Sequence, residues 1–367
     1  MRQPVRLAII GLGFGAKVHL PAFLSIPGVR VVGVADSGLG AAKRVAATVE
    51  DGVMAWHDWK EAIEASEVDA ISVVTPPPGQ AEIVCAALAT GKHVLCEKPF
   101  GMNGEQAAEM WENAQATDRV NAVDFQFRME PGLTKMKQLI DSGQVGEVRR
   151  IKVKWLTRGG ADPAVLWSWR HDTHLGGGVL NGFVSHVIDY LEWMCGIRIS
   201  CVSGRCEILV GERRDAGGRK HKVTAEDSCE LVCYLANGAV ANVTVSNCCT
   251  SAHERHQIDV EGLGGRLSFI HKAPFARDSA KLFFGRDSPS LRPVSLEALP
   301  GPECPDTRLQ PFRQIAARFV EAASGSQVRD LPDFACGLRV QRILDAARES
   351  LRSGCVVWVV EEGSACR

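Results

Sequence analysis

The sequence has almost no excess of charge of either sign. Its 367 residues contain 42 lysines and arginines against 43 aspartates and glutamates, so the formal net charge is −1. Nucleic acids and anionic membrane surfaces attract proteins through an excess of basic residues. The balance therefore argues against nucleic acid or a membrane surface as a main partner.

Long apolar runs are also missing. No stretch approaches the roughly 20 residues that cross a bilayer, and the N-terminus enters the first expected strand without an apolar leader or a small-residue cleavage site. These absences predict a cytoplasmic protein. The length suits two domains of ordinary size.

Cysteine is abundant, but its spacing is not that of a metal site. The chain has 13 cysteines, and the closest of them lack the two-residue separation of zinc ligands. These pairs are Cys201 and Cys206, Cys229 and Cys233, and Cys248 and Cys249. In a reducing compartment they act as small buried apolar residues, so we expect no bound metal.

The first third of the chain alternates apolar β-branched runs with helical patterns. The expected strands are residues 7–10, 31–34, 54–56, 70–74, 93–96 and 120–123. The expected helices are residues 17–25, 39–49, 59–65, 80–90 and 104–116. Continuous apolar runs indicate strands that are buried on both faces. The order predicts an α/β domain over residues 1–124, with a doubly wound parallel sheet.

From about residue 125 the pattern changes. Expected strands follow one another with few helices between them, at residues 148–155, 199–210, 229–236, 239–247, 256–262, 266–270 and 356–360. The expected helices are residues 132–142, 178–194, 309–323 and 333–353, and the proline-rich residues 287–308 are expected to form a loop. We predict an α+β domain over residues 125–367 with a large open, mostly antiparallel sheet. The uncovered face of such a sheet predicts a homodimer or homotetramer.

The most informative motif follows the first expected strand. Residues 11–16 form a G-x-G-x-x-[G/A] turn between a buried strand and a helix. Gly11 permits the tight turn, Gly13 lets the backbone approach a pyrophosphate, and Ala16 allows close packing of the helix on the strand. The following helix offers free N–H groups to the phosphates. The predicted cofactor contacts in this turn are Gly11, Leu12, Gly13, Phe14 and Gly15.

An acidic residue stands where the adenosine ribose is expected. Asp36 ends the next apolar run, about twenty residues past the turn, at the spacing of a carboxylate that accepts the ribose hydroxyls. A carboxylate there repels a 2′-phosphate, so NAD is favoured over NADP. Lys43 and Arg44 lie nearby and keep NADP open as an alternative.

Two further motifs follow strands of the expected parallel sheet. Thr75-Pro76-Pro77-Pro78 forms a rigid loop after the fourth strand, and Glu97-Lys98-Pro99 follows the fifth. The proline restricts Lys98, and their peptide bond can adopt the cis form. A lysine beside a cationic nicotinamide ring is expected to have a lowered pKa, which would suit it to exchange a proton with a substrate hydroxyl.

A third constellation lies in the second domain. Three glycines at residues 176–178 precede an expected helix that carries His186 and Asp189. The glycines allow close approach of the backbone to a ligand. A neutral imidazole suits a general base near pH 7, and Asp189 lies three residues further on the same helical face. The structural alternative is a core histidine whose hydrogen bonds are satisfied within the protein.

Together these motifs resemble the glucose–fructose oxidoreductase / inositol dehydrogenase / rhizopine catabolism family. The matching segments are residues 11–16, Asp36, Thr75-Pro76-Pro77, Glu97-Lys98-Pro99, Trp169-Arg170, the three glycines and His186-x-x-Asp189. The resemblance implies an N-terminal Rossmann domain, a nicotinamide cofactor, and sugars, inositols or their keto forms as substrates. It also implies that Lys98 contacts the reacting hydroxyl, that Glu97 contacts the cofactor and that His186 is the acid/base.

The remaining candidates come from the same segments. We expect Thr75, Pro76, Pro77 and Gln80 to line the cofactor site, and Arg128, Trp169, Arg170 and Asn181 to bind substrate beside Lys98 and His186. Trp167 and Trp169 suit stacking on a sugar ring, and Arg170 suits a carboxylate or a hydroxyl. His171, Asp172 and His174 fit no zinc spacing.

Three positions depart from the family pattern. Gly182 stands where many members have an aspartate four residues before the histidine, Gln80 replaces a frequent histidine, and Gln126 replaces an asparagine. Asp189, Asp172 or a water is left as the partner of His186, unless the histidine works alone. We predict an NAD(P)-dependent oxidoreductase that moves a hydride between nicotinamide and a carbinol or keto carbon. The alternative is a non-catalytic dinucleotide sensor of the same fold.

Overall fold

The chain divides into two compact units in the computed structural model. The structure describes residues 3–38, 40–49, 52–249, 254–272, 280–286, 290–299 and 306–360. The first unit comprises Met1–Met129 and Pro300–Arg339, and the second comprises Glu130–Leu299 and Val340–Arg367. The sequence predicts a single domain boundary after residue 124. In the structure, Pro300–Arg339 also belongs to the first unit. The reason is that α8 (Leu309–Ala323) packs on α1 (Leu20–Leu24) and on the 3-10 turn η3 (Gln126–Met129).

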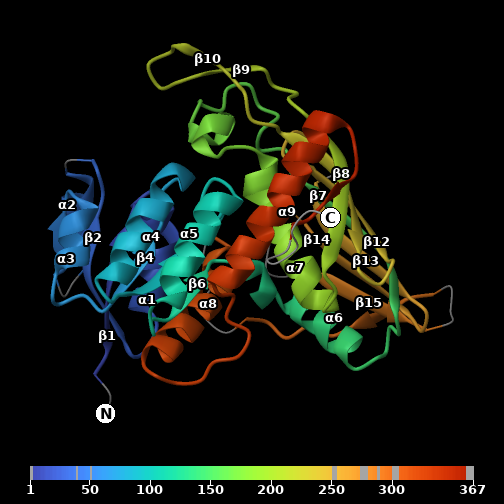
Figure 1. The fold of residues 1–367 in the computed structure, drawn as a ribbon, viewed down its shortest axis with the longest axis horizontal. Coiled ribbons are helices and arrows are strands. Elements are labelled where there is room, and N and C mark those ends of the chain that lie inside the picture. The colour runs from blue at the N-terminus through green and yellow to red at the C-terminus, as the bar shows by residue number, and fades with distance from the viewer. Residues whose placement is uncertain are drawn as a thin grey trace. The chain divides into compact units, whose positions relative to one another are not determined.

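A six-stranded parallel sheet forms the centre of the first unit (Figure 1). Its strands lie in the order β3-β2-β1-β4-β5-β6, which is the strand order of the dinucleotide-binding Rossmann fold. Their bounds are β1 Val5–Ile10, β2 Val29–Ala35, β3 Met54–Trp56, β4 Ala70–Val73, β5 His93–Cys96 and β6 Asn121–Val123. The helices are α1, α2 (Ala41–Ala46), α3 (Trp59–Glu64), α4 (Gln80–Ala89), α5 (Gly104–Gln115) and α8. The predicted doubly wound parallel sheet is confirmed.

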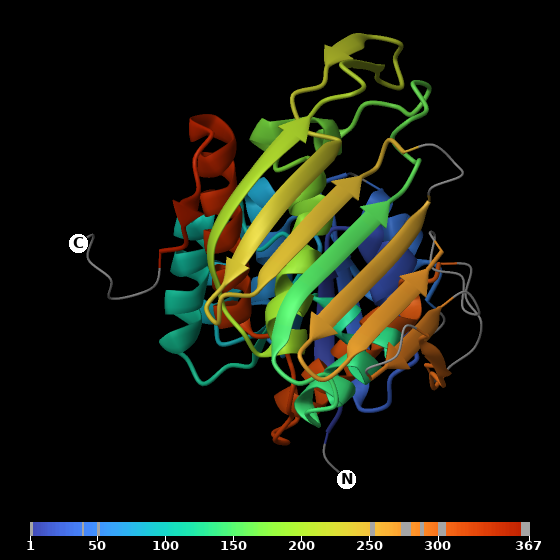
Figure 2. The same cartoon turned by 90° about the vertical axis from the view of Figure 1, so that its right-hand side faces the viewer.

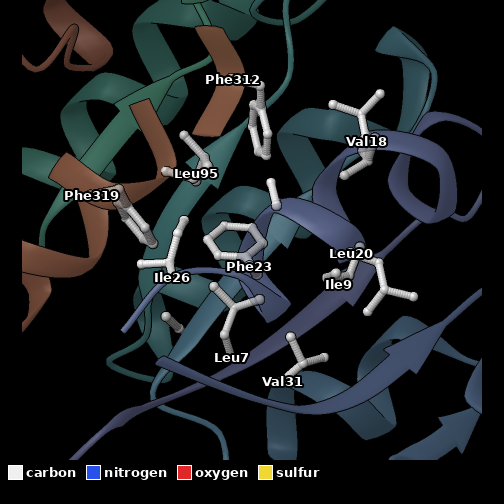
Figure 3. Packing of buried hydrophobic residues seen from close by; sticks show 14 of the residues in the cluster. Leu7, Ile9, Val18, Leu20, Phe23, Ile26, Val31, Leu95, Phe312 and Phe319 are labelled. Carbon is white, nitrogen blue, oxygen red and sulfur yellow. The ribbon is translucent and has the colours of Figure 1, made fainter. Parts of the chain in front are cut away.

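The core of the first unit contains side chains from both ends of the chain (Figure 3). Leu7 of β1, Phe23 of α1 and Phe312 and Phe319 of α8 belong to one cluster and have no exposed surface. Burial of each such side chain contributes about 1.5–3 kcal/mol. This burial explains why α8 belongs to the first unit, although it follows the strands of the second in sequence.

The second unit is built on a nine-stranded sheet. The strand order is β16-β15-β14-β13-β7-β12-β11-β8-β17, and every pair is antiparallel except β12 with β7. The bounds are β7 Val148–Leu156, β8 Ile199–Glu207, β11 Ser228–Leu235, β12 Val240–Ser246, β13 Arg255–Gly262, β14 Arg266–His271, β15 Lys281–Gly285, β16 Arg292–Val294 and β17 Val357–Trp358. A separate hairpin pairs β9 (Glu212–Arg214) with β10 (Lys220–Lys222). The predicted open, mostly antiparallel sheet is confirmed.

Some elements of the second unit differ from the prediction. β16 lies in the segment that was expected to be a loop, and the β9–β10 hairpin was not expected. Short strands of three residues carry too little alternation to be recognised from sequence. The helices of the unit are α6 (Pro131–Asp141), α7 (Ser185–Cys195) and the C-terminal part of α9 (Phe334–Ser353), whose first residues belong to the first unit.

The two faces of the nine-stranded sheet differ in polarity. Along β7, Ile151, Val153 and Trp155 are buried, whereas Lys152 and Lys154 between them are exposed. Figure 2 presents one broad face of this sheet to the viewer. The exposed face is polar, so it has no large apolar surface that would have to be covered by another subunit. Homo-oligomerisation through this face stays a prediction. In the described part of the chain, no helix is long and apolar enough to cross a membrane.

A buried acid starts α6. Burial raises the pKa of Glu130 to about 7, and the backbone N–H of Gly132 acts in the opposite direction with a smaller effect. His271 of β14 is also buried, with its Nδ1 3.9 Å from Glu130 Oε1. The folded chain therefore keeps a proton on Glu130 at pH values where the unfolded chain has lost it.

We expect Glu130→Gln to remove a pH-dependent loss of stability. As pH rises from about 4.5 to about 7, the unfolded chain releases this proton and the folded chain does not, so the wild-type free energy of unfolding falls by up to about 3 kcal/mol. Denaturant unfolding between pH 4.5 and 8 should show the variant gaining stability over wild type as pH rises. Glu105→Gln, at an exposed site on α5, is the control. Parallel curves for wild type and Glu130→Gln would contradict this account.

Candidate functional site

The glycine turn after β1 holds two glycines with different surroundings. Gly11 has φ +95°, and a Cβ there would lie 2.6 Å from the carbonyl oxygen of Val74. Its N–H donates to the carbonyl of Ala35 at 2.9 Å. A Cβ on Gly13 would meet no described atom within 4 Å. The fold itself therefore requires Gly11, whereas Gly13 leaves open space above the backbone that a ligand can approach.

The helical segment after the turn begins as a π-helix, η1 (Gly15–His19), and continues as α1. A Cβ on Gly15 would lie 3.1 Å from Cγ2 of Ile9 on β1. The close packing of helix on strand that was expected at Ala16 is therefore found at Gly15, which is buried. Single π-helical turns are frequent at functional sites.

Asp36, directly after β2, is joined to the glycine turn. Its Oδ2 accepts from the N–H of Leu12 at 2.9 Å, and its Oδ1 accepts from the N–H of Gly38 at 2.9 Å. A carboxylate has about four acceptor positions, so it can still accept from a diol. Lys43 and Arg44 are exposed on the following α2.

Gln80 connects the loops that follow β4 and β5. Its Nε2 donates to the carbonyls of Thr75 at 3.3 Å and Glu97 at 3.0 Å, and its Oε1 accepts from the N–H of Gly101 at 2.8 Å. The side chain has no exposed surface. The amide of Gln80 therefore fixes the two loops, and its contact with a cofactor stays a prediction.

The loop after β4 contains a buried hydroxyl that has no hydrogen-bond partner among the described residues. Thr75 Oγ1 is buried and makes no hydrogen bond to any described residue. Pro76 beside it is exposed, and Pro77 is buried at the start of the 3-10 turn η2 (Pro77–Gly79). An unpaired hydroxyl beside the glycine turn is a free donor for a ligand.

Under Lys98 lies a hydrogen-bonded network that the sequence analysis missed. His19 of η1 is fully buried, and its Nε2 lies 2.9 Å from Oε1 of Glu97 while its Nδ1 lies 2.8 Å from Oγ of Ser72. The other carboxylate oxygen of Glu97 accepts from the N–H of Lys98 at 3.1 Å. A histidine between the apolar Val18 and Leu20 was the signal in the sequence.

Asp124, after β6, completes this cluster. Burial raises the pKa of Asp124 well above its usual range, and the charge of Glu97 raises it further. Burial also acts to raise the pKa of Glu97, but the hydrogen bond and charge of His19, together with Asp124 and the charge of Lys98, outweigh it and the pKa is lowered. The cluster therefore favours the ionised form of Glu97 and the protonated form of Asp124.

The side chains of His19, Glu97 and Asp124 lie close enough together to be considered as metal ligands. His19, Glu97 and Asp124 can offer ligand atoms within 4.8 Å of one another. Both nitrogens of His19 already have protein partners, so we interpret the group as a hydrogen-bonded network. The carboxylate of Glu97 is buried against His19 and the backbone of Lys98, and its contact with a cofactor stays a prediction.

Lys98 stands at the carboxyl edge of the parallel sheet. The Lys98–Pro99 peptide is cis, as the motif allowed, and the lysine side chain is half-buried. Its charge lowers the pKa of both Glu97 and Asp124, so the ammonium lies near this pair. Arg128 of η3 is buried in the same unit, and its role in substrate binding stays a prediction.

His186 lies in the second unit as the second residue of α7. A π-helical turn, η6 (Leu180–Val184), precedes it, instead of the two regular turns that the sequence predicted. The imidazole is buried, and its ring centroid lies 6.2 Å from that of Trp155 on β7. A Cβ on Gly182 would meet no described atom within 4 Å. The position of the aspartate found in many family members is therefore roomy here.

Asn181 fixes the start of this helix. Its Nδ2 donates to the carbonyl of Gly176 at 3.1 Å, and its Oδ1 accepts from Arg348 at 2.6 Å. Glu226 supports the same turn, because its Oε1 accepts from the N–H of Leu180 at 2.9 Å. Asn181 is buried and positions this turn, and its contact with substrate stays a prediction. Arg348 and Glu226 lie far away in sequence and no motif marked them.

The tryptophan-rich approach to the glycines is organised by local contacts. The guanidinium of Arg170 lies 4.7 Å from the ring centroid of Trp169. Trp167 stacks on His221 with centroids 4.5 Å apart, so one face of its ring is already occupied. Roles for Trp169 and Arg170 in substrate binding stay predictions.

The polar side chains of residues 168–174 form hydrogen bonds that stabilise local turns. His171 Nδ1 accepts from the N–H of Ser168 at 3.0 Å. Asp172 Oδ1 accepts from the N–H of His174 at 2.9 Å and from Oγ1 of Thr224 at 3.2 Å. The carboxylate of Asp172 therefore caps its own turn.

Comparison with known families assigns both parts of the chain. The model of a family described as an oxidoreductase family with an NAD-binding Rossmann fold matches residues 5–125. The model of the GFO/IDH/MocA C-terminal domain matches residues 133–268.

Individual relatives include named dehydrogenases. An uncharacterized oxidoreductase of Synechocystis sp. is 30% identical over 71% of this chain and 70% of its own length. Levoglucosan dehydrogenase of Pseudarthrobacter phenanthrenivorans is 27% identical over 95% of this chain and 96% of its own length. A structure of levoglucosan dehydrogenase in complex with NADH and L-sorbose superposes with a TM-score of 0.86 at 26% identity, covering 98% of this chain and 100% of that one. The scyllo-inositol 2-dehydrogenase (NAD(+)) of Bacillus subtilis is 32% identical over 57% of this chain and 59% of its own length.

Proposed function

Because the chain belongs to the GFO/IDH/MocA family of NAD-binding oxidoreductases, we propose that it is a dehydrogenase acting on a carbinol carbon of a sugar, an inositol or a related polyol. The observation that carries the proposal is the glycine turn, where Gly13 faces open space and Leu12 is joined to the carboxylate of Asp36. Relatives named for levoglucosan and scyllo-inositol support this substrate class.

The residues of the first unit fit a bound dinucleotide. The backbone of Gly13 and Phe14 would approach the pyrophosphate, and Asp36 would accept the ribose hydroxyls. The unpaired hydroxyl of Thr75 adds a donor close to the turn. When bound, NAD supplies the nicotinamide carbon that accepts or returns the hydride.

Lys98 is assigned to the reacting hydroxyl. Its backbone is held through Glu97, whose carbonyl and carboxylate are in turn held by Gln80 and His19. The ammonium donates a hydrogen bond to the substrate oxygen and stabilises the negative charge that develops as the hydroxyl proton leaves. The ionised carboxylate of Glu97 favours this charged form of the lysine.

We assign the transfer of the substrate's hydroxyl proton to His186. When a carbinol is oxidised, the imidazole of His186 would take the O–H proton of the bound substrate, while a bound NAD would supply the hydride acceptor. In the reverse direction the imidazolium returns the proton to the new hydroxyl. No carboxylate stands at Gly182, so we assign the proton transfer to His186 without that partner. Asn181, Arg348 and Glu226 position the helix that carries it.

We expect the purified chain to reduce NAD⁺ in the presence of at least one member of a panel of anhydrosugars, inositols, glucosides and ketoses. NADH absorbance follows the reaction, and mass spectrometry identifies any nucleotide that co-purifies. NADH binding without turnover over the whole panel would favour the alternative, a dinucleotide sensor. A chain that binds neither NADH nor NADPH would contradict both functions.

The cofactor preference tests Asp36. We expect Asp36→Asn to weaken NADH binding about tenfold, because an amide offers one acceptor oxygen where the carboxylate offered two. The preference for NAD⁺ over NADP⁺ should shrink as well, because the charge that repels a 2′-phosphate is gone. Asp58→Asn, which caps α3 in the same unit, is the control with an equal change of charge. Unchanged preference in Asp36→Asn would remove Asp36 from the ribose site.

A further inference from the structure

We propose that Arg308 is a binding residue for the pyrophosphate of the dinucleotide, delivered to the glycine turn by the segment that leads into α8. The proposal rests on the proposed function, since it presumes a dinucleotide at this turn. It adds a contact from residues almost 300 positions after the turn, where no nucleotide motif exists.

The side chain of Arg308 lies over the glycine turn. Its guanidinium carbon is 4.7 Å from the ring centroid of Phe14, the residue directly after Gly13. An arginine over an aromatic ring is held by a cation–π attraction. Arg308 thus lies next to the segment of backbone that faces open space.

Asp306 fixes the orientation of the guanidinium. Arg308 Nε donates to Asp306 Oδ1 at 2.8 Å, and a terminal nitrogen donates to Oδ2 at 2.5 Å. About half of the arginine side chain and a quarter of the aspartate side chain remain exposed, at 50% and 25%. A guanidinium has five N–H donors, and this pairing uses two of them. The remaining donors form a pre-oriented fork for an anion, and planar bidentate recognition of phosphate is the typical use of arginine.

The backbone of Arg308 is also fixed. It is the N-cap residue of α8, and Phe312 in the first turn of that helix packs on the ring of His19 with centroids 3.9 Å apart. Arg313 anchors the same helix to the end of α1 through Ser25. The guanidinium is therefore presented by a buried helix and not by a free loop.

The charges around the turn support an anionic ligand. The pKa of Asp306 is lowered chiefly by its hydrogen bond to Arg308, and the charge of Lys17, which is exposed on η1, lowers it further. The pKa of Arg308 is raised chiefly by its hydrogen bond to Asp306, with a smaller contribution from the charge of Glu97, so the guanidinium lies within electrostatic reach of the network that includes Glu97. Lys17 and Arg308 thus place two cationic side chains beside the glycine turn. The neighbouring carboxylate of Asp306 is paired with Arg308.

The test measures binding and not turnover. Kd values for NADH and for ADP-ribose, which keeps the pyrophosphate but lacks nicotinamide, are compared in Arg308→Ala, Arg308→Lys and wild type, each at 50 and 200 mM salt. We expect Arg308→Ala to weaken both ligands by about the same factor, roughly tenfold, and to reduce the salt dependence. Arg308→Lys should recover part of the affinity, because it keeps the charge but not the fork. Arg318→Ala is the matched control: this arginine lies on the same helix and donates to the carbonyl of Gln314 one turn earlier, so the variant should bind both ligands within about twofold of wild type.

Three results would overturn the assignment. If Arg308→Ala lowers Tm but leaves both Kd values unchanged, the arginine serves only to pack on Phe14. If it weakens NADH but not ADP-ribose, its effect falls on the nicotinamide half. If wild type binds neither ligand, the proposed function fails and the assignment fails with it, a result that is distinct from the other two because it needs no variant.

Discussion

Lys98→Met and His186→Gln should each lower kcat by about 10²–10⁴-fold, because each removes a group that handles the hydroxyl proton or the charge on its oxygen. The Kd for NADH should change little, since neither residue is assigned to the pyrophosphate or the ribose.

Controls separate chemistry from folding. Lys60→Met removes an exposed lysine that lies over Trp59 in the same unit, and we expect wild-type turnover from it. His186 is buried, so unchanged Tm and NADH binding must accompany the loss of turnover in His186→Gln. Either variant retaining a tenth or more of wild-type kcat would refute the role assigned to that residue.

Gly13→Val should weaken NADH binding by about a hundredfold, ~3 kcal/mol, while Tm stays near the wild-type value. A side chain at this position meets no described protein atom within 4 Å, so the folded chain accepts it. The same side chain occupies the space through which a pyrophosphate approaches the backbone.

Gly11→Val provides the contrast. There φ is +95° and a Cβ would lie 2.6 Å from the carbonyl oxygen of Val74, so the substitution should lower stability itself, by about 3 kcal/mol or more. Tm and NADH binding, measured on both variants, distinguish the two glycines. If Gly13→Val binds NADH as wild type does, the glycine turn is not the pyrophosphate site and the proposed function falls.

Several parts of the fold follow from neighbouring residues alone. The six parallel strands, the glycine turn with Asp36 one strand later, and the cis Lys98–Pro99 bond depend on short patterns along the chain. Apolar runs, turn residues and fixed spacings act over a few residues, so the sequence shows them directly.

Predictions about particular side chains were less secure. Gln80, Glu97 and Asn181 are expected to contact ligands, and the structure shows that each also uses its polar atoms on the protein. A motif specifies which residue stands at a strand end or a helix start. It does not specify whether a backbone group or a ligand receives the hydrogen bonds, because that depends on segments that arrive from elsewhere in the chain.

The sequence by itself determined the class of this protein: a parallel dinucleotide-binding sheet, an open antiparallel sheet, and the glycines, carboxylate and lysine at the edge of the first. Only the tertiary structure decided which distant residues support them. His19 meets Glu97 across 78 positions, Asn181 meets Arg348 across 167, and α8 returns from the far end of the chain to pack on α1 and η3. The physical reason is that burying an apolar surface lowers the free energy whichever apolar surface covers it, and a buried polar group can be satisfied by any suitable hydrogen-bond partner. Which residues meet therefore depends on the packing of the whole unit and not on a local pattern.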